Sequence, residues 1–322
     1  MPVIPLGRAS AGTARPAPAR ALKMAIAGYT GSEGKGMIQS REGQPGDGGH
    51  RHAISSRGTL SPHQSTCPID APEVWIRGAR LHAITESQCV ALMLSEIEEQ
   101  RGGSIITMNL DHLRRFVTDP SYAALCDRAR VVTADGMPLI WASRLQGTPL
   151  PERVTGSNLI WSLSGGAAGA QRSIYLIGGA PETARKTAGI LTNRYPGLRI
   201  AGVSAGRISI ENDRGELQEL SKAVAAARPD IVYVALSSPK QEQVIDRLRQ
   251  EFPATWWVGV GIAFSFVTGD VRRAPLWMQG AGLEWSHRLL QEPRRLAKRY
   301  LIQGIPFAFT LLGSAALRRL FH

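Results

Sequence analysis

Short apolar runs alternate with longer amphipathic stretches from Val74 onward, and this alternation restricts the chain to few folds. The stretches between the apolar runs carry helix start signals, since Thr85 with Gln88 can form a capping box and Pro181 suits a first helical turn. Strands that alternate with such helices predict an α/β fold, a Rossmann-like, mainly parallel sheet with helices on both faces. We expect the strands at Ser104–Met108, Arg130–Ala134, Ser173–Ile177, Ile200–Ser204, Ile231–Leu236 and Thr255–Val260.

Composition divides the 322 residues into three parts. Residues 1–72 are rich in Gly, Ser, Pro and Arg without apolar periodicity, which predicts either a disordered extension or a start codon assigned too early. Residues 73–271 form the expected α/β core. From residue 272 to 322 the pattern changes to helices alone, and we expect a basic amphipathic appendage there, with helices at Leu283–Gln291 and Arg294–Leu301.

Cysteine usage and acidic motifs both argue against a metal site. The three cysteines, Cys67, Cys89 and Cys126, are scattered and form no CxxC pair, which is typical of a reducing compartment without structural disulfides or zinc. The chain also contains no Asp-x-Asp pair of the kind that holds a divalent metal against a diphosphate. We therefore predict no metal and no cofactor, so that cations of the chain itself must meet the charge of a diphosphate substrate.

The positive charge of the chain is concentrated at its C-terminal end. The net charge is +12, and residues 272–322 contain nine Arg or Lys against only Glu284 and Glu292. This surplus predicts a negatively charged partner, either a nucleic acid, an anionic membrane or a phosphorylated substrate. Tyr300–Leu317 is 18 residues without a charge, contains Gly and Pro, and has basic flanks, which favours a helix lying on an anionic leaflet over a packed core helix. Cations beside an apolar segment favour a membrane over nucleic acid.

Five of the expected strands are followed by small or polar residues. Ligands of open parallel sheets bind beyond the carboxyl ends of the strands, so these residues predict one cleft. The strand ends carry Thr107 and Asn109, Asp135-Gly136, Gly178-Gly179, Ser237 to Gln241, and Gly259 with Gly261.

Three positions at these strand ends suggest chemistry, and each has a plainer alternative. Asp135 would be desolvated in a cleft, which raises its pKa toward the range of a general base; alternatively it caps the helix after Gly136. Lys240 and Gln241 follow Ser238-Pro239 at an expected helix start, with Ser238 as N-cap, which is either an anion site or a solvated first turn. Arg153 can clamp a phosphate, or it is an ordinary surface arginine.

Taken together and in this order, these segments resemble the WecG/TagA/CpsF family of bacterial glycosyltransferases. The resemblance covers about Val74 to Arg299. The segments that carry it are Thr107-Met-Asn109, Ala134-Asp135-Gly136, Pro151 to Ser157, Tyr175 to Gly179, Ser238-Pro-Lys-Gln-Glu242, Gly259-Val-Gly261, Arg273-Ala-Pro275, Gly282-Leu-Glu-Trp285 and Arg288 to Arg295.

The resemblance implies an inverting, metal-independent hexosyltransferase of cell-envelope or exopolysaccharide biosynthesis. Its donor would be a UDP-sugar and its acceptor a sugar on undecaprenyl diphosphate, at the cytoplasmic face of the membrane, to which the protein would attach peripherally. By position, Asp135 resembles the catalytic base. The implied substrate-binding residues are Thr107, Asn109, Arg153, Gly178, Gly179, Lys240, Gln241, Arg288, Arg295, Lys298 and Arg299.

Some departures and alternatives stay open. Asn158, Ser237 and Ser265 stand where many family members have other residues, so the sugar could be of the N-acetylmannosamine, glucose or uronic-acid type. A non-catalytic scaffold of a polysaccharide assembly complex is an alternative function, and a basic nucleic-acid-binding protein is another. A homo-oligomer that hides the apolar tail away from the membrane is also compatible with the sequence.

Overall fold

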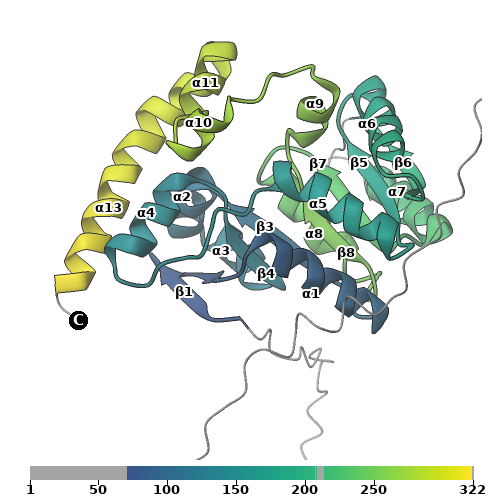
Figure 1. Cartoon of the computed structure of the whole chain (residues 1–322), viewed down its shortest axis with the longest axis horizontal. Helices are drawn as coiled ribbons and strands as arrows, with labels where there is room; N and C mark the ends of the chain where they lie inside the picture. The colour runs from purple at the N-terminus through teal and green to yellow at the C-terminus, as the bar shows by residue number, and fades with distance from the viewer. Residues whose placement is uncertain (1–70, 207, 209–213, 321–322) are drawn as a thin grey trace, which may run out of the picture. The chain divides into compact units, whose positions relative to one another are not determined.

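The computed structural model describes residues 71–206, 208 and 214–320, all within one compact unit, Cys67–His322 (Figure 1). The extension expected over residues 1–72 lies outside the described residues except for its last two positions, and so does Cys67. Cys89 and Cys126 are both buried free thiols. The division between a core and an appendage at residue 272 stays a prediction.

A six-stranded parallel sheet forms the centre of this unit, with the strand order β4-β3-β8-β7-β5-β6. This confirms the predicted α/β fold, and every expected strand is present within one or two residues. The strands are β3 (Gly103–Met108), β4 (Val131–Ala134), β5 (Ser173–Gly178), β6 (Arg199–Ser204), β7 (Ile231–Ala235) and β8 (Trp256–Gly259). An antiparallel hairpin of β1 (Glu73–Ile76) and β2 (Ala79–His82), which the sequence analysis missed, forms a separate small sheet.

Alternate residues of each strand enter different cores, because successive side chains of a strand point to opposite faces. In β3, Ile105 packs with α1 (Glu86–Glu98) and α5 (Gly156–Gly169), whereas Ile106 packs on the opposite face. In β8, Trp256 likewise packs in the same core as Ile105, and Trp257 packs in a core on the opposite face of the sheet. Burial on both faces explains why the strands read as continuous apolar runs.

Helices cover both faces of the sheet (Figure 1). Two of their start signals are confirmed. Thr85 Oγ1 accepts from the Gln88 N–H at 3.2 Å while Gln88 Oε1 accepts from the Thr85 N–H at 2.9 Å, and α6 (Pro181–Arg194) begins with its proline. The remaining helices before the C-terminal segment are α2 (Leu110–Thr118), α3 (Pro120–Asp127), α4 (Met137–Leu145), α7 (Arg214–Ala227), α8 (Lys240–Leu248) and α9 (Ala263–Thr268).

The predicted N-cap at Ser238 is wrong. α8 begins at Lys240, its cap position is Pro239, and no side chain caps it. The Ser238 hydroxyl instead donates to the Tyr122 hydroxyl at 3.3 Å, so the side chain is used in a tertiary contact with α3. The helix is held by packing of its buried face rather than by a cap, and α8 buries Val244, Ile245 and Leu248.

The C-terminal segment is more continuous than the sequence predicted. After α10 (Leu276–Gly280) and α11 (Glu284–Gln291), one helix runs from Pro293 to Leu320, made of α12 (Pro293–Ala297), a π-helical stretch η1 (Lys298–Gly304) and α13 (Ile305–Leu320). Within the described residues it is the one helix long and apolar enough to cross a membrane, and 11% of its most apolar window is buried.

This helix joins the core along one side only. α13 runs beside α4 in Figure 1, and its Leu311 and Ala315 are buried in the cluster to which β1 to β4 and α2 to α4 contribute. Phe309, Leu317 and Leu320 are exposed by 74%, 56% and 77%. One face of this helix therefore packs on the core and the opposite face is exposed, while its position on a membrane stays a prediction.

Candidate active site

One cavity of about 1310 Å³ lies beyond the carboxyl ends of the strands. Its walls include residues that follow β3, β4, β5, β7 and β8, the five strand ends that the sequence singled out. Parallel strands bring their carboxyl ends to one edge of the sheet, so residues far apart in the chain meet there. Helices α10 to α13 and the first turns of several core helices, among them α2 and α4, also contribute to the wall.

Ten of the twelve predicted site residues line this cavity: Asp135, Thr107, Asn109, Arg153, Gly179, Lys240, Gln241, Arg288, Arg295 and Arg299. Gly178 and Lys298 do not. Gly178 is the last residue of β5, with φ +87°, and a Cβ there would lie 2.6 Å from the Ala235 carbonyl oxygen, so this glycine serves strand packing. Lys298 is exposed and does not line the cavity. The structure therefore places neither residue in the cavity wall, and of the two neighbouring cations Lys298 and Arg299 it brings Arg299 to the cavity.

Asp135 lies at the end of β4, held by the bond from its N–H to the Met108 carbonyl at 2.8 Å. Its carboxylate does not cap α4, whose cap position is Gly136 and which has no side-chain cap. The pKa of Asp135 is raised to about 7, mainly because the carboxyl group is buried. The positive charge of Arg153 opposes this rise, the negative charge of Glu284 adds to it, and Arg273 and Arg288 oppose it as well. This carboxyl group therefore exchanges its proton near neutral pH.

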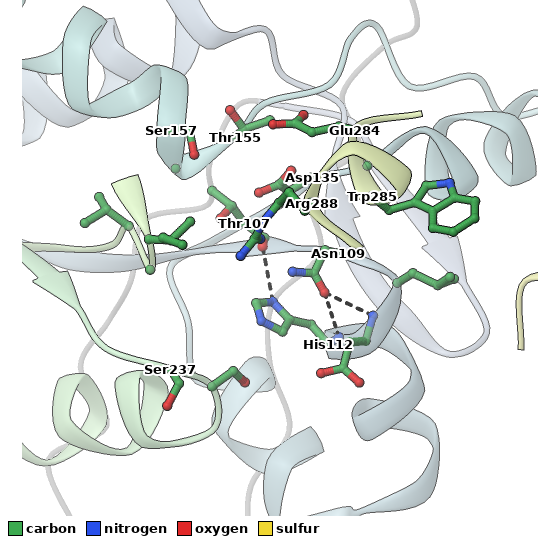
Figure 2. A pocket seen from close by; sticks show the side chains of 18 of the residues that line it. Thr107, Asn109, His112, Asp135, Thr155, Ser157, Ser237, Glu284, Trp285 and Arg288 are labelled. Atoms are coloured by element: carbon green, nitrogen blue, oxygen red, sulfur yellow. Dashed lines mark hydrogen bonds between the residues drawn. The ribbon is translucent and has the colours of Figure 1, made fainter. Parts of the chain in front are cut away.

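Thr107 and Asn109 flank Asp135 on β3 and at the start of α2 (Figure 2). The Asn109 Oδ1 accepts from the N–H groups of Asp111 and His112 at 3.0 and 3.1 Å, so it caps α2. Since the oxygen is used in the cap, the NH₂ group is the part of this side chain open to a ligand. The sequence indicated a ligand contact here but not the cap.

Gln241 fixes the glycine loop that follows β8. Its Oε1 accepts from the Gly261 N–H at 2.8 Å, and its Nε2 donates to Glu242 Oε1 at 3.1 Å. A Cβ on Gly259 would lie 2.3 Å from the Gln241 Nε2, so only glycine lets the two segments approach this closely. Gln241 thus shapes the cavity wall through the loop as well as lining it.

Arg153 belongs to an ion-pair network that the sequence did not reveal. The Glu284 Oε2 accepts from Arg153 Nη1 at 2.8 Å, and its Oε1 accepts from Arg273 Nε at 3.3 Å. Arg273 Nη1 also donates to Asn158 Oδ1 at 2.7 Å. Arg273 and Glu284 belong to segments that carry the family resemblance, but the sequence assigned no role to either residue. Nothing in the sequence indicates that Arg153 and Glu284, which are 131 positions apart, form an ion pair.

The C-terminal arginines reach the same cavity from α11, α12 and η1. Arg288 stacks over the Phe266 ring at 5.9 Å, and its Nε is buried without a hydrogen-bond partner among the described residues. Arg295 pairs with Glu292, and the Nε of Arg299 lies 3.2 Å from the Asp111 Oδ2. In Figure 2, Asp135 and Arg288 lie together with Glu284 at one side, while Trp285 points away from them.

No cluster of three or more His, Cys, Asp or Glu side chains that could hold a metal ion occurs among the described residues. The charged groups of the cavity are instead paired or single carboxylates among arginines. Such an arrangement can accept one proton at Asp135 and bind an anionic group at the guanidinium ends.

Comparisons with known proteins assign the chain to a family. Residues 74–320 match the model of the "Glycosyl transferase WecG/TagA/CpsF family". A protein of Bacillus spizizenii is 32% identical over 199 residues, which cover 62% of this chain and 75% of the relative, and one of Bacillus subtilis is 32% identical over 227 residues, covering 70% and 85%. Each is called N-acetylglucosaminyldiphosphoundecaprenol N-acetyl-beta-D-mannosaminyltransferase.

The parallel sheet has a cavity at its strand ends, and the family model matches almost the whole described chain, which together define the class of the protein as a glycosyltransferase. The enzyme class predicted from the sequence, a hexosyltransferase, is confirmed. The chain belongs to the WecG/TagA/CpsF family.

Proposed function

We propose that this enzyme transfers a sugar from a UDP-sugar to a sugar carried on a polyprenyl diphosphate, with inversion at the anomeric carbon. The observation that carries the proposal is Asp135, a cavity carboxylate whose pKa is raised to about 7, among arginines that reach the same cavity. The names of the two relatives support an undecaprenyl-diphosphate-linked acceptor and an N-acetylmannosamine donor sugar.

In the proposed reaction an acceptor hydroxyl attacks the anomeric carbon of the donor. The new C–O bond forms as the bond from that carbon to the UDP oxygen breaks, and the hydroxyl proton passes to Asp135. One displacement inverts the configuration. A base whose pKa lies near the working pH combines a large ionised fraction with a useful proton affinity, which is the condition for efficient general base catalysis.

We propose that arginines receive the negative charge that develops on UDP. Arg288 Nε and Arg273 Nη2 are buried and have no hydrogen-bond partner among the described residues, so both can donate to a phosphate oxygen. Donors already fixed in a cavity cost no reorganisation when charge develops in the transition state. Charge supplied in this way would make the transfer independent of a metal ion.

The far wall of the cavity suits a lipid-linked acceptor. Ile305, Phe309 and Leu312 of α13 line it together with Trp141 of α4. An apolar wall continuous with a charged end fits a molecule that carries a diphosphate between a sugar and a hydrocarbon chain. We infer that the prenyl chain leaves the cavity along this wall.

The outer face of the same helix supports attachment to a membrane. Ile302, Leu317 and Leu320 are exposed there, and Arg294, Lys298, Arg318 and Arg319 flank them. Apolar residues in one stripe with cations beside it bind an anionic leaflet from the surface. We propose that the enzyme lies peripherally on the cytoplasmic face, and that it pairs with a second copy over this stripe when no membrane is present.

Incubation of the purified enzyme with a panel of UDP-sugars and a polyprenyl-diphosphate-linked N-acetylglucosamine tests the proposal, with the product weighed by mass spectrometry. We expect one added hexose residue with one or a few donors, at an unchanged rate after treatment with EDTA. A loss of the rate with EDTA would contradict the metal-independent part alone. No product with any donor would contradict sugar transfer and favour the scaffold alternative.

A further inference from the structure

Glu284 joins the C-terminal segment to the core at the active-site edge. It is the first residue of α11, and its side chain is 20% exposed. Its two oxygens accept from arginines of two different loops, Arg153 before α5 and Arg273 before α10. The carboxylate is thus shared by both arginines, which are also held by Gln279 and Asn158: Arg153 Nη2 donates to Gln279 Oε1 at 3.4 Å and Arg273 Nη1 to Asn158 Oδ1 at 2.7 Å.

The turn before Glu284 fixes its distance from Asp135. Gly282 has φ +73°, and a Cβ there would lie 2.8 Å from both the Met137 Cβ and the Trp141 ring. Only glycine permits that approach and that backbone conformation. Met137 is the first residue of α4, two positions after Asp135, so the turn that carries Glu284 rests on the segment that carries the base.

The charged groups that act on Asp135 come from three places. Arg153 lies in the loop before α5, Arg273 in the loop before α10, and Glu284 and Arg288 on α11. Despite these three arginines, no hydrogen bond or ion pair engages the Asp135 carboxylate within the described part of the chain, because Arg153 and Arg273 point to Glu284. Without that carboxylate, either arginine could turn to Asp135.

We propose that Glu284 is a positioning residue for Asp135: by holding Arg153 and Arg273, it keeps both from pairing with Asp135 and leaves that carboxylate free to take a proton. The inference deepens the proposed function, on which its catalytic meaning rests. An aspartate paired with an arginine holds its proton weakly, with a pKa lowered by about 1–3 units, and is a poor base near neutral pH.

The variant Glu284→Gln tests this in the full-length enzyme, because it keeps the shape of the side chain and removes the charge. We expect the pH at half-maximal kcat to fall by about one unit and kcat itself to fall at least about tenfold, with a smaller change in KM. Asp246→Asn is the matched control, since Asp246 also pairs with two arginines, Arg128 and Arg249, at 15% exposure but outside the cavity.

The control should keep the wild-type pH profile even if it loses stability. A Glu284→Gln enzyme with the wild-type pH midpoint would overturn the inference, whether its kcat is kept or is reduced to the same extent as in Asp246→Asn.

A second measurement needs no substrate. The thermal unfolding midpoints of the wild type, Glu284→Gln, Asp135→Asn and the double variant are compared from about pH 5 to about pH 8. Above pH 7, we expect Asp135→Asn to raise the unfolding midpoint of the wild type much more than it raises the midpoint of Glu284→Gln. Equal effects in both backgrounds would overturn the inference. A failed sugar-transfer proposal would instead appear as absent product with the wild type, with this cycle unaffected.

Discussion

The Nε of Arg299 lies 3.2 Å from the Oδ2 of Asp111, which joins the π-helical stretch of the C-terminal helix to the helix that follows β3. On the other side of the cavity, Glu284 joins α11 to Arg153. These two ion pairs tie the C-terminal segment to the core at residues that line the strand-end cavity, in addition to the packing of Leu311 and Ala315. This explains how arginines near the end of the chain come to lie in one cavity with Asp135.

The rate of sugar transfer should depend on pH through the protonation of Asp135. Asp135 must be deprotonated to act as a base, and its pKa is raised to about 7. We expect kcat to rise about tenfold per pH unit below that value and to level off above it. Initial rates at saturating donor and acceptor measure this, and a rate that is flat from about pH 5.5 to about pH 8.5 would remove Asp135 from the rate-limiting proton transfer.

The free energy of unfolding should also depend on pH because the pKa of Asp135 is raised in the folded enzyme. As the pH rises from about 4 to about 7, the unfolded chain loses the Asp135 proton while the folded chain keeps it, so the free energy of unfolding falls. A shift from 3.8 to about 7 corresponds to at most about 4 kcal/mol. Asp135→Asn should therefore raise the unfolding midpoint at pH 8 and change it little at pH 4, as calorimetry can determine. An equal effect at both values would contradict the raised pKa.

Arg288 should contribute to the binding affinity of the enzyme for UDP. A charge-assisted hydrogen bond contributes about 1.5–3 kcal/mol, so we expect Arg288→Ala to weaken UDP binding roughly 10- to 150-fold. Arg288→Lys should be intermediate, because lysine keeps the charge but not the planar fork. Titration calorimetry with UDP measures the affinities. Arg185→Ala is the control, since Arg185 is exposed on α6 and outside the cavity. Wild-type affinity in Arg288→Ala would count against the proposed role.

Membrane attachment can be tested without removing the C-terminal helix. A deletion would also remove Leu311 and Ala315 from the core, so its effects would be mixed. The triple variant Ile302→Gln, Leu317→Gln, Leu320→Gln changes exposed residues alone. We expect it to lose most of its flotation with anionic vesicles and to keep its unfolding midpoint, with Val117→Gln on α2 as control. Unchanged flotation would refute attachment through this stripe.

The sheet and its strand-end cavity followed from the sequence because both depend on local patterns. Buried strands such as Ile231–Ala235 read as uninterrupted apolar runs, and the polar residues after them must meet at one edge once the strands are parallel. The hairpin of β1 and β2 was missed since its turn, Arg77-Gly78, has positive φ at both residues but only one glycine to indicate it.

Where the structure differs from what the sequence predicted near the site, tertiary contacts decide the position of the side chain. Ser238 has the residue type of an N-cap, yet its hydroxyl bonds Tyr122. Lys298 and Arg299 are neighbours of equal charge, and only the helix geometry turns Arg299 to the cavity and Lys298 to solvent. The partnership of Glu284 with Arg153 and Arg273 depends on how distant loops pack, which no local pattern encodes.

The most direct measurement of the central claim compares the transfer rates of the wild type and Asp135→Asn at about pH 8, with saturating donor and acceptor and with folding of both verified by circular dichroism. Asparagine keeps the size of the side chain and cannot accept the proton, so the account predicts a loss of about 10²- to 10⁴-fold in kcat. Rates equal within a factor of about two would contradict the assignment of Asp135 as the catalytic base.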